Sequence, residues 1–249
     1  YTEKFYGNND VEGPEASHGT HVAGIIGADR TNKIGIQGVA DQAILMSVRA
    51  VPDGDERDKD IANAIIYAVN NGAKVINMSF GKGYSPGKKY VDQAVKYAAK
   101  KDVLLVHAAG NSSADNDATP NFPNRRYAKK GIFGKKSADN WIEVGALNWQ
   151  TGEDIVAPFS NYGKNNVDIF APGVDLNSTV PNQGYRKLSG TSMASPVVAG
   201  VATMLRSYFP TLSAKETKEI ILQSAHKVNE NVKLPGSDKV VPFSDLSVT

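Results

Sequence analysis

The chain alternates between short apolar runs and stretches in which apolar residues recur at helical spacing. The short runs are rich in aliphatic and β-branched residues and predict buried strands at 44–51, 75–78, 103–106 and 141–144. Between them, one-sided apolar spacing predicts two helices, through Ile61, Ile65, Ala68 and Val69 and through Val91, Ala94, Val95 and Ala98. Strands that alternate with helices indicate an α/β fold with a mainly parallel sheet covered on both faces, a three-layer α/β/α arrangement.

Polar segments lie between these elements, but none of them indicates a boundary between two domains. Residues 213–225 are expected to form an amphipathic helix, with Ser213 as N-cap and Glu216 completing a capping box. Residues 112–136 are rich in Asn, Asp, Pro, Lys and Arg, which is typical of a long surface excursion. A chain of 249 residues with 41% hydrophobic content can bury a large core, so we expect residues 1–249 to form one domain.

One heptapeptide, Gly-Thr-Ser-Met-Ala-Ser-Pro at 190–196, is poorly explained by packing alone. It places Ser192 between small residues, immediately before the apolar run 196–205, which predicts a buried helix. Small neighbours let a substrate backbone approach closely, and the positive end of a helix dipole stabilises negative charge that develops there. Ser192 is therefore a candidate nucleophile, and a serine nucleophile needs a general base within hydrogen-bond reach.

Two further segments supply the chemistry that such a serine requires. His-Gly-Thr-His-Val-Ala-Gly at 18–24 offers His18 as the general base. Ala-Ala-Gly-Asn at 108–111 follows a predicted strand and offers the amide of Asn111 as a hydrogen-bond donor. In sequence, order and spacing the three segments resemble the subtilisin-like serine proteases (subtilases), and the likeness covers most of the chain, from Ser17 to Ser224.

The resemblance implies a subtilisin-like fold and a serine endopeptidase that works through an acyl-enzyme. Ser192 would attack the peptide carbonyl, His18 would shuttle the proton, and Asn111 with the Ser192 backbone N–H would hold the oxyanion. Simpler structural interpretations stay open, with Asn111 as a turn residue after Gly110 and His18 as a helix-start histidine bonded to local backbone. Another serine hydrolase, such as an esterase, is disfavoured because the Gly-x-Ser-x-Gly motif would have Ala194 at its fifth position.

The subtilase family places an aspartate upstream of the histidine, in an Asp-Thr-Gly or Asp-Ser-Gly motif that ends a buried strand. Residues 1–17 contain no such motif and no apolar run, so they indicate a loop. We expect the aspartate-bearing strand to lie outside residues 1–249, which makes that N-terminal segment, or a propeptide, an expected partner. Two alternatives stay open. Asp10 replaces the aspartate, or the aspartate is lost and the chain is an inactive module that binds peptides or a partner through the same cleft.

The resemblance also implies that a peptide or protein substrate binds as an extended strand along exposed backbone edges. The matching positions are Ser79, Phe80 and Gly81 on one side and Ala108, Ala109 and Gly110 on the other. The two glycines would keep backbone approach and pocket entry open. A medium or large apolar residue at the P1 position of the substrate is the expected preference.

No cofactor is required for this chemistry, but one loop resembles a structural calcium site of many subtilases. Asp29 and Asn32 offer side-chain oxygens, and Ile34 and Ile36 would offer carbonyl oxygens. Calcium takes six to eight oxygens, some of which the family supplies from its N-terminal region. A zinc site is disfavoured, because no glutamate follows the first histidine of the His-x-x-His pair that ends at His21, and no third ligand is nearby. His21 is therefore expected to be structural.

Composition narrows the choice of partners. Lys and Arg number 28 against 26 Asp and Glu, and the two signs are interspersed, so nucleic acid is not an expected partner. The chain has no cysteine, which excludes disulfides and thiolate metal sites. No apolar run reaches the length of a membrane span, and no signal peptide is present. A secreted or cell-envelope location is expected from the family resemblance alone.

Overall fold

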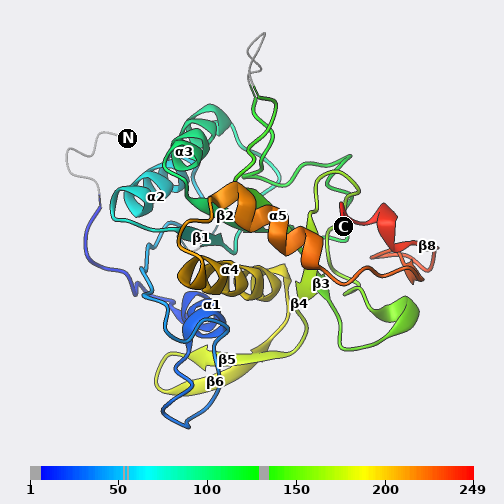
Figure 1. The fold of residues 1–249 in the computed structure, drawn as a ribbon, viewed down its shortest axis with the longest axis horizontal. Helices are drawn as coiled ribbons and strands as arrows, with labels where there is room; N and C mark the ends of the chain where they lie inside the picture. The colour runs from blue at the N-terminus through cyan, green and yellow to red at the C-terminus, as the bar shows by residue number, and fades with distance from the viewer. Residues whose placement is uncertain (1–6, 53, 55, 129–134) are drawn as a thin grey trace.

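Four parallel strands form the central sheet of the computed structural model, which describes residues 7–52, 54, 56–128 and 135–249 (Figure 1). The order in the sheet is β1-β2-β3-β4, and the strands span Val75–Met78, Leu104–Ala108, Trp141–Leu147 and Ile169–Pro172. The register pairs Met78 with His107 and Ala108 with Val144, so neighbouring strands end at a common edge. Sites in open parallel sheets gather at this edge, where the carboxyl ends of the strands lie.

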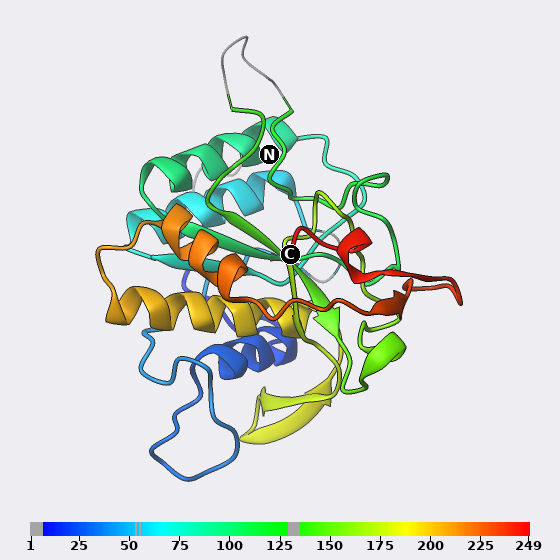
Figure 2. The same ribbon diagram turned by 45° about the vertical axis from the view of Figure 1, so that its right-hand side comes forward.

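Helices cover both faces of the sheet (Figure 2). The helices α2 (Asp58–Asn70) and α3 (Lys88–Lys100) cover one face, and α4 (Thr191–Tyr208) and α5 (Ala214–Ser224) cover the other. The helix α1 (Ser17–Gly27) packs against α4. The predicted three-layer α/β/α fold with a parallel central sheet is therefore confirmed.

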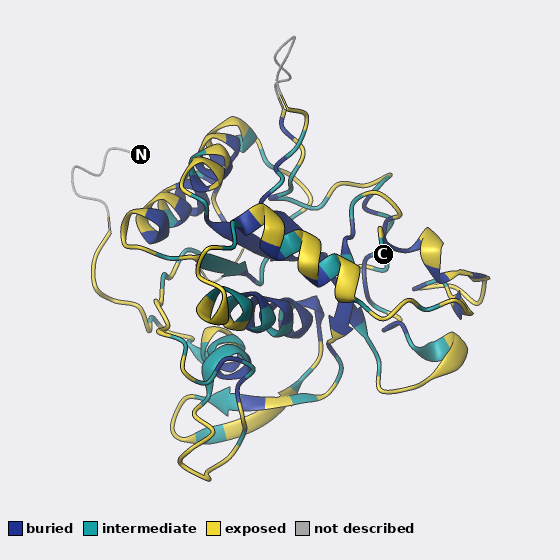
Figure 3. Cartoon of the chain, in the orientation of Figure 1, coloured by how far each residue is buried: buried dark blue, intermediate teal, exposed yellow. Residues whose placement is uncertain are grey.

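Side chains of β2 alternate between two hydrophobic cores, because successive residues of a strand point to opposite faces. Leu105 belongs to the core under α2 and α3, whereas Leu104 and Val106 belong to the core under α4 and α5. All three residues are completely buried, and Figure 3 shows β2 and β3 among the most buried parts of the chain, whereas β1 is mostly of intermediate burial. Burial of each such aliphatic side chain contributes about 1.5–3 kcal/mol, so the path of β2 is firmly fixed.

Two antiparallel hairpins complete the fold. The strands β5 (Leu176–Val180) and β6 (Gly184–Leu188) pair with each other, and β5 lies against α1. The strands β7 (Asn231–Lys233) and β8 (Val240–Pro242) form the second hairpin. The remaining short elements are the 3-10 turns Gly152–Asp154 and Phe243–Asp245. Among the described residues, no helix is long and apolar enough to cross a membrane.

One predicted strand is wrong, while the other three strands and the predicted helices are confirmed. Residues 44–51 have no strand pairing, and Ile44 is 101% exposed relative to a free side chain. A strand exists through hydrogen bonds to its neighbours, and apolar composition alone cannot supply a neighbour. At the end of the sheet, β1 pairs only with β2 in the described part of the chain. Both β1 and residues 44–51 therefore have backbone groups available for another strand.

The capping box predicted for α5 is present. Ser213 Oγ accepts from the Glu216 backbone N–H, and the Glu216 carboxylate accepts from the Ser213 backbone N–H. We predict that Ser213→Ala lowers the free energy of unfolding by about 1 kcal/mol, because the helix loses its cap. Urea denaturation followed by circular dichroism measures this change. The matched control Ser207→Ala, at an exposed position in α4, should shift that free energy by less than about 0.5 kcal/mol. Equal losses in the two variants would contradict the prediction.

Candidate active site

Ser192 is the second residue of α4 and lies beside the residue that follows β1. Its Oγ donates to the carbonyl oxygen of Ser79 over 3.3 Å, and Ser79 Oγ donates to the carbonyl oxygen of Ser192 over 2.8 Å. The first of these bonds is long for a hydroxyl donor. The start of the serine helix is thus tied to the end of β1, while the Ser192 hydroxyl itself is only weakly engaged.

The first residue of the same helix orients the side chain of Asn111. Thr191 donates to Asn111 Oδ1 twice, from its backbone N over 2.8 Å and from its hydroxyl over 3.0 Å. The Thr191 hydroxyl in turn accepts from the Gly110 N–H over 3.1 Å. Since two donors engage the amide oxygen, the Nδ2 hydrogens of Asn111 are directed elsewhere. Thr191 is absent from the predicted site residues, although it directly precedes Ser192 in the heptapeptide.

Two hydrogen-bond donors converge above Gly190. A Cβ atom placed on Gly190 would lie 3.3 Å from Asn111 Nδ2 and 3.6 Å from the backbone N of Ser192. Because glycine has no Cβ, these two nitrogens border an open volume next to Ser192, and Asn111 Oδ1 lies slightly farther away, 3.7 Å from the same position. An oxygen that gains negative charge in this volume would be stabilised by both donors and by the N-terminus of α4.

A cavity of about 250 Å³ opens beside the two donors. Its lining includes residues 80–83, which follow β1, and Ala108 with residues 110–112, which end and follow β2. The two segments predicted to bind substrate therefore face one cavity. Two of the predicted residues do not line it: the Ser79 hydroxyl is bonded to the α4 backbone, and Ala109 is completely buried. Further lining residues, which the sequence did not single out, are Lys82, Gly83, Ser112, Ala114, Thr119, Pro120, Asn121, Asn161 and Thr191.

Asparagine side chains explain why two lining positions are glycine. A Cβ on Gly81 would lie 2.6 Å from Asn121 Nδ2, and a Cβ on Gly110 would lie 2.5 Å from Asn161 Nδ2. Gly110 also has a φ of 110°, which side chains disfavour. The glycines were expected to keep the pocket open to substrate, and the structure shows that they also admit two amide side chains.

His18 lies near the start of α1, the helix that packs against the serine helix α4. Figure 1 shows the two helices side by side. No hydrogen bond joins His18 to Ser192 within the described part of the chain, where the Ser192 hydroxyl donates to Ser79 instead. Burial, and to a smaller extent the neighbouring His21, lower the pKa of His18 below its ordinary value of 6.5. The fold therefore brings the two helices together and favours neutral, proton-accepting His18, without the catalytic hydrogen bond. Such bonds are often long or unformed before a substrate binds.

His21 is structural, as the sequence predicts. Its ring is completely buried, and Nε2 lies 3.1 Å from the carbonyl oxygen of Leu176 and 2.8 Å from that of Arg186. These carbonyls belong to β5 and β6, so the histidine holds the hairpin against α1. No cluster of three or more His, Cys, Asp or Glu that could hold a metal occurs among the described residues.

Asp10 does not take the place of the family aspartate in this structure. The residue is exposed, its Oδ1 accepts from the Gly13 N–H over 3.0 Å, and its Oδ2 lies 3.8 Å from the guanidinium of Arg49. These contacts are those of a turn residue. The alternative in which Asp10 orients His18 has no hydrogen bond to support it in the described chain.

The loop expected to bind calcium uses its polar oxygens for its own turns. Asp29 Oδ1 accepts from the backbone N and from the hydroxyl of Thr31, both over 2.7 Å, and these bonds lower the pKa of the Asp29 carboxyl. Asn32 Oδ1 accepts from the Ile34 N–H over 2.8 Å. Calcium requires six to eight oxygens. The four predicted positions, which include the carbonyl of Ile36, do not make a complete site by themselves.

Comparison with known proteins places the chain in a family. A sequence model of the subtilase family, Peptidase_S8, matches residues 1–240, so the chain belongs to the subtilases. A thermophilic serine proteinase of Bacillus sp. (strain AK1) is 40% identical over 214 residues, which cover 86% of this chain and 48% of that protein. Thermitase of Thermoactinomyces vulgaris is 37% identical over 226 residues, which cover 90% of this chain and 73% of thermitase.

The fold comparison agrees with the family. The crystal structure of a cold adapted subtilisin-like serine proteinase has a TM-score of 0.69 with 31% identity, covering 92% of this chain and 74% of that one. The chain spans about half the length of the first curated relatives that it matches, between 48% and 52%. Family membership and fold are thus established, and the activity has to be argued from the site.

The lowered pKa of His18, the proposed general base, can be tested by titration. Burial disfavours the charged imidazolium, so we predict that His18 loses its proton with a midpoint below pH 6.5. NMR titration of the imidazole resonances measures the midpoint, and His18→Gln assigns the signal. The exposed His226 provides the matched assignment control through His226→Gln. A His18 midpoint at or above 6.5 would show that burial does not control its charge.

Proposed function

We propose that the chain is the peptidase domain of a serine endopeptidase that hydrolyses peptide bonds through an acyl-enzyme. The observation that carries this proposal is the convergence of Asn111 Nδ2 and the Ser192 backbone N on the open volume above Gly190. An acyl-transfer site needs such a pair of donors within reach of its nucleophile. A scaffold that only binds peptides has no need for this arrangement.

The chemistry follows from the position of each group. Ser192 Oγ leaves its long hydrogen bond to Ser79 and attacks the carbonyl carbon of the scissile peptide, while His18 accepts the hydroxyl proton. The carbonyl oxygen gains negative charge and is held by Asn111 and the Ser192 N–H. His18 then returns the proton to the leaving amine, and a water molecule hydrolyses the ester. No cofactor takes part, and a calcium ion near residues 29–36 would act on stability only, with oxygens from outside the loop.

The carboxylate that orients His18 is proposed to come from an additional strand outside residues 1–249. Two features support this proposal: β1 has a free edge within the described chain, and the apolar residues 44–51 have no strand partner. A further strand would pair with such backbone groups and cover exposed side chains such as Ile44. Residues 1–249 then form one domain together with that strand.

The proposed substrate is a peptide or protein segment in extended conformation. Phe80 and Ala108 give the cavity apolar lining, which supports a medium or large apolar P1 residue. Asn121 and Asn161 add amide groups to the lining. We further propose a secreted or cell-envelope location, in keeping with the subtilisins among the relatives.

Covalent labelling of Ser192 tests the proposal. A fluorophosphonate probe reacts with an activated serine, so we predict an intact-mass shift in the complete natural protein and none in Ser192→Ala. Ser189→Ala, a nearby exposed serine whose Oγ lies 3.3 Å from Asp175, is the control and should label normally. A folded protein that binds peptides but takes up no label would instead be the inactive binding module.

The oxyanion role of Asn111 can be tested by the size of the loss in kcat when its side chain is removed. Removal of the corresponding donor in subtilisin, itself the reference case for this effect and a member of the family, costs about 10²–10³-fold in kcat. We predict a loss of that order for Asn111→Ala, with KM little changed, in hydrolysis of a chromogenic peptide. Asn71→Ala, at an exposed asparagine that directly follows α2, should retain normal kcat. A loss that falls on KM alone would assign Asn111 to substrate binding.

A further inference from the structure

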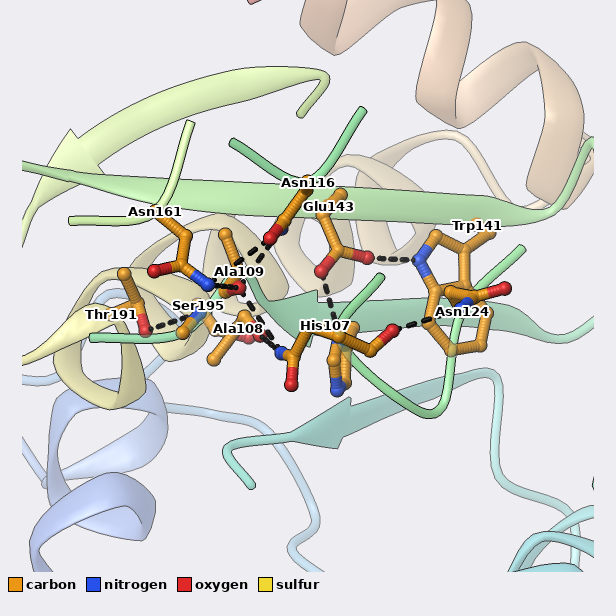
Figure 4. A network of polar contacts seen from close by, with 12 residues as sticks. His107, Ala108, Ala109, Asn116, Asn124, Trp141, Glu143, Asn161, Thr191 and Ser195 are labelled. Carbon is orange, nitrogen blue, oxygen red and sulfur yellow. Dashed lines mark hydrogen bonds and ion pairs between the residues drawn. The ribbon is translucent and has the colours of Figure 1, made fainter. Parts of the chain in front are cut away.

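Asn161 makes every hydrogen bond that an asparagine side chain can make. Its Oδ1 accepts from the backbone N–H groups of Ser112 over 2.9 Å and Ala114 over 3.0 Å. Its Nδ2 donates to the carbonyl oxygen of Ala109 over 3.0 Å and to Oδ1 of Asn116 over 3.1 Å (Figure 4). An amide side chain has two donor hydrogens and two acceptor lone pairs, so its capacity is fully used.

These hydrogen bonds hold the backbone on both sides of Asn111. The Asn161 side chain bonds to Ala109 before it and to Ser112 and Ala114 after it. The backbone N of Asn161 adds a bond to the carbonyl oxygen of Gly110 over 2.8 Å. Asn161, which lies between the 3-10 turn after β3 and the strand β4, therefore contacts the loop at four of the residues from Ala109 to Ala114. Other bonds hold the same loop, among them those from Thr191 to Asn111 and from the Ser113 N–H to the Phe159 carbonyl oxygen.

Asn161 is 4% exposed, although the residue belongs to the cavity lining. Since all of its polar capacity is used within the protein, Asn161 has no donor or acceptor left for a substrate. Its effect on catalysis must then pass through the loop that it holds. A Cβ placed on Gly110 would lie 2.5 Å from Asn161 Nδ2, so the amide occupies the space beside this backbone.

We propose that Asn161 is a positioning residue that fixes the hydrogen-bond donor of Asn111 for the oxyanion. This inference rests on the proposed function and adds a residue for which the sequence analysis assigned no role. Thr191 holds the Asn111 amide oxygen from the side of α4, and Asn161 holds the backbone from the opposite segment. Thr191 and Asn161 are both needed, because the orientation of a side chain is defined only when its amide group and its backbone are both held in place.

The expected effect of Asn161→Ala is large but smaller than that of losing the donor. A displacement of about 1 Å in a catalytic group can cost about 100-fold in rate. The Ala109 carbonyl retains two other amide donors, from Asn116 over 3.0 Å and from Asn121 over 3.1 Å, which limits the movement. We predict a fall in kcat of about 10-fold to 100-fold, with KM changed by less than about threefold.

A double-mutant cycle separates positioning from general damage to the fold. If Asn161 acts through Asn111, then Asn161→Ala should lower kcat in the wild-type background and leave it nearly unchanged in the Asn111→Ala background. Multiplication of the two losses in the double variant would overturn the inference. The matched control is Asn140→Ala, which removes an equally buried asparagine whose Nδ2 donates to the Val103 carbonyl over 2.7 Å, before the start of β2. That variant should lose stability and keep its kcat.

A spectroscopic readout makes the test independent of proteolytic activity. The side-chain NH₂ signals of Asn111 in the complete natural protein should shift or broaden in Asn161→Ala and stay in place in Asn140→Ala. Unmoved Asn111 signals in a folded Asn161→Ala protein would overturn the inference, whatever its activity. Should that variant not fold, Asn161→Asp keeps both acceptor oxygens and loses both donations, to the Ala109 carbonyl and to Asn116 Oδ1, and the same two outcomes apply to it. Failure of Ser192 to react with the fluorophosphonate probe refutes the proposed function separately.

Discussion

The hydrogen bonds from Thr191 to Asn111 Oδ1 join the two elements on which the site depends. The first N–H groups of any helix lack partners within that helix. Here one of them, at the start of α4, is satisfied by the side chain that follows β2. Helix α4 is buried against the sheet, and β2 lies between two cores, so neither can move alone. Because both elements are held rigidly, the hydrogen bonds between them keep the Asn111 amide pointing in one direction.

A second polar network holds the same strand from within the core (Figure 4). His107 Nδ1 lies 2.8 Å from Glu143 Oε1, and Trp141 Nε1 donates to Glu143 Oε2 over 2.7 Å. Burial raises the pKa of the Glu143 carboxyl, which the neighbouring His107 opposes. The Glu143 backbone N–H donates to Asp168, whose other oxygen accepts from Lys218 of α5. The Glu143 carboxylate is paired on both oxygens, whereas the buried His107 Nε2 has no hydrogen-bond partner among the described residues. The bond between His107 and Glu143 links β2 to β3 at the register position where these two residues pair.

The parts of the fold that depend on local sequence could be predicted. The parts that depend on contacts with distant segments of the chain could not. Residues 75–78 are a strand as expected, because their apolar side chains and their neighbour β2 are both present. Residues 44–51 are also rich in aliphatic residues but have no neighbouring strand, so they are not a strand. In the site, Ser192 and Asn111 stand in distinctive motifs. Asn161 has no such signal, because its role arises from five hydrogen bonds to residues that lie 45 to 52 positions away in the chain.

Under the proposed function, the group that stabilises the oxyanion and the group that moves the proton differ in how far the described residues complete them. The group that stabilises the oxyanion is assembled from β2, α4 and the segment around Asn161. The group that moves the proton is not, since His18 has no hydrogen bond to Ser192 and a pKa lowered by burial. A carboxylate beside the imidazole would raise that pKa and fix the tautomer that accepts from serine. In subtilisin, the reference case for such measurements, loss of the triad leaves about 10³–10⁴-fold catalysis over water, supplied by the oxyanion site and by binding. Under the proposed function, the donors above Gly190 would therefore contribute to the rate independently of how His18 is oriented.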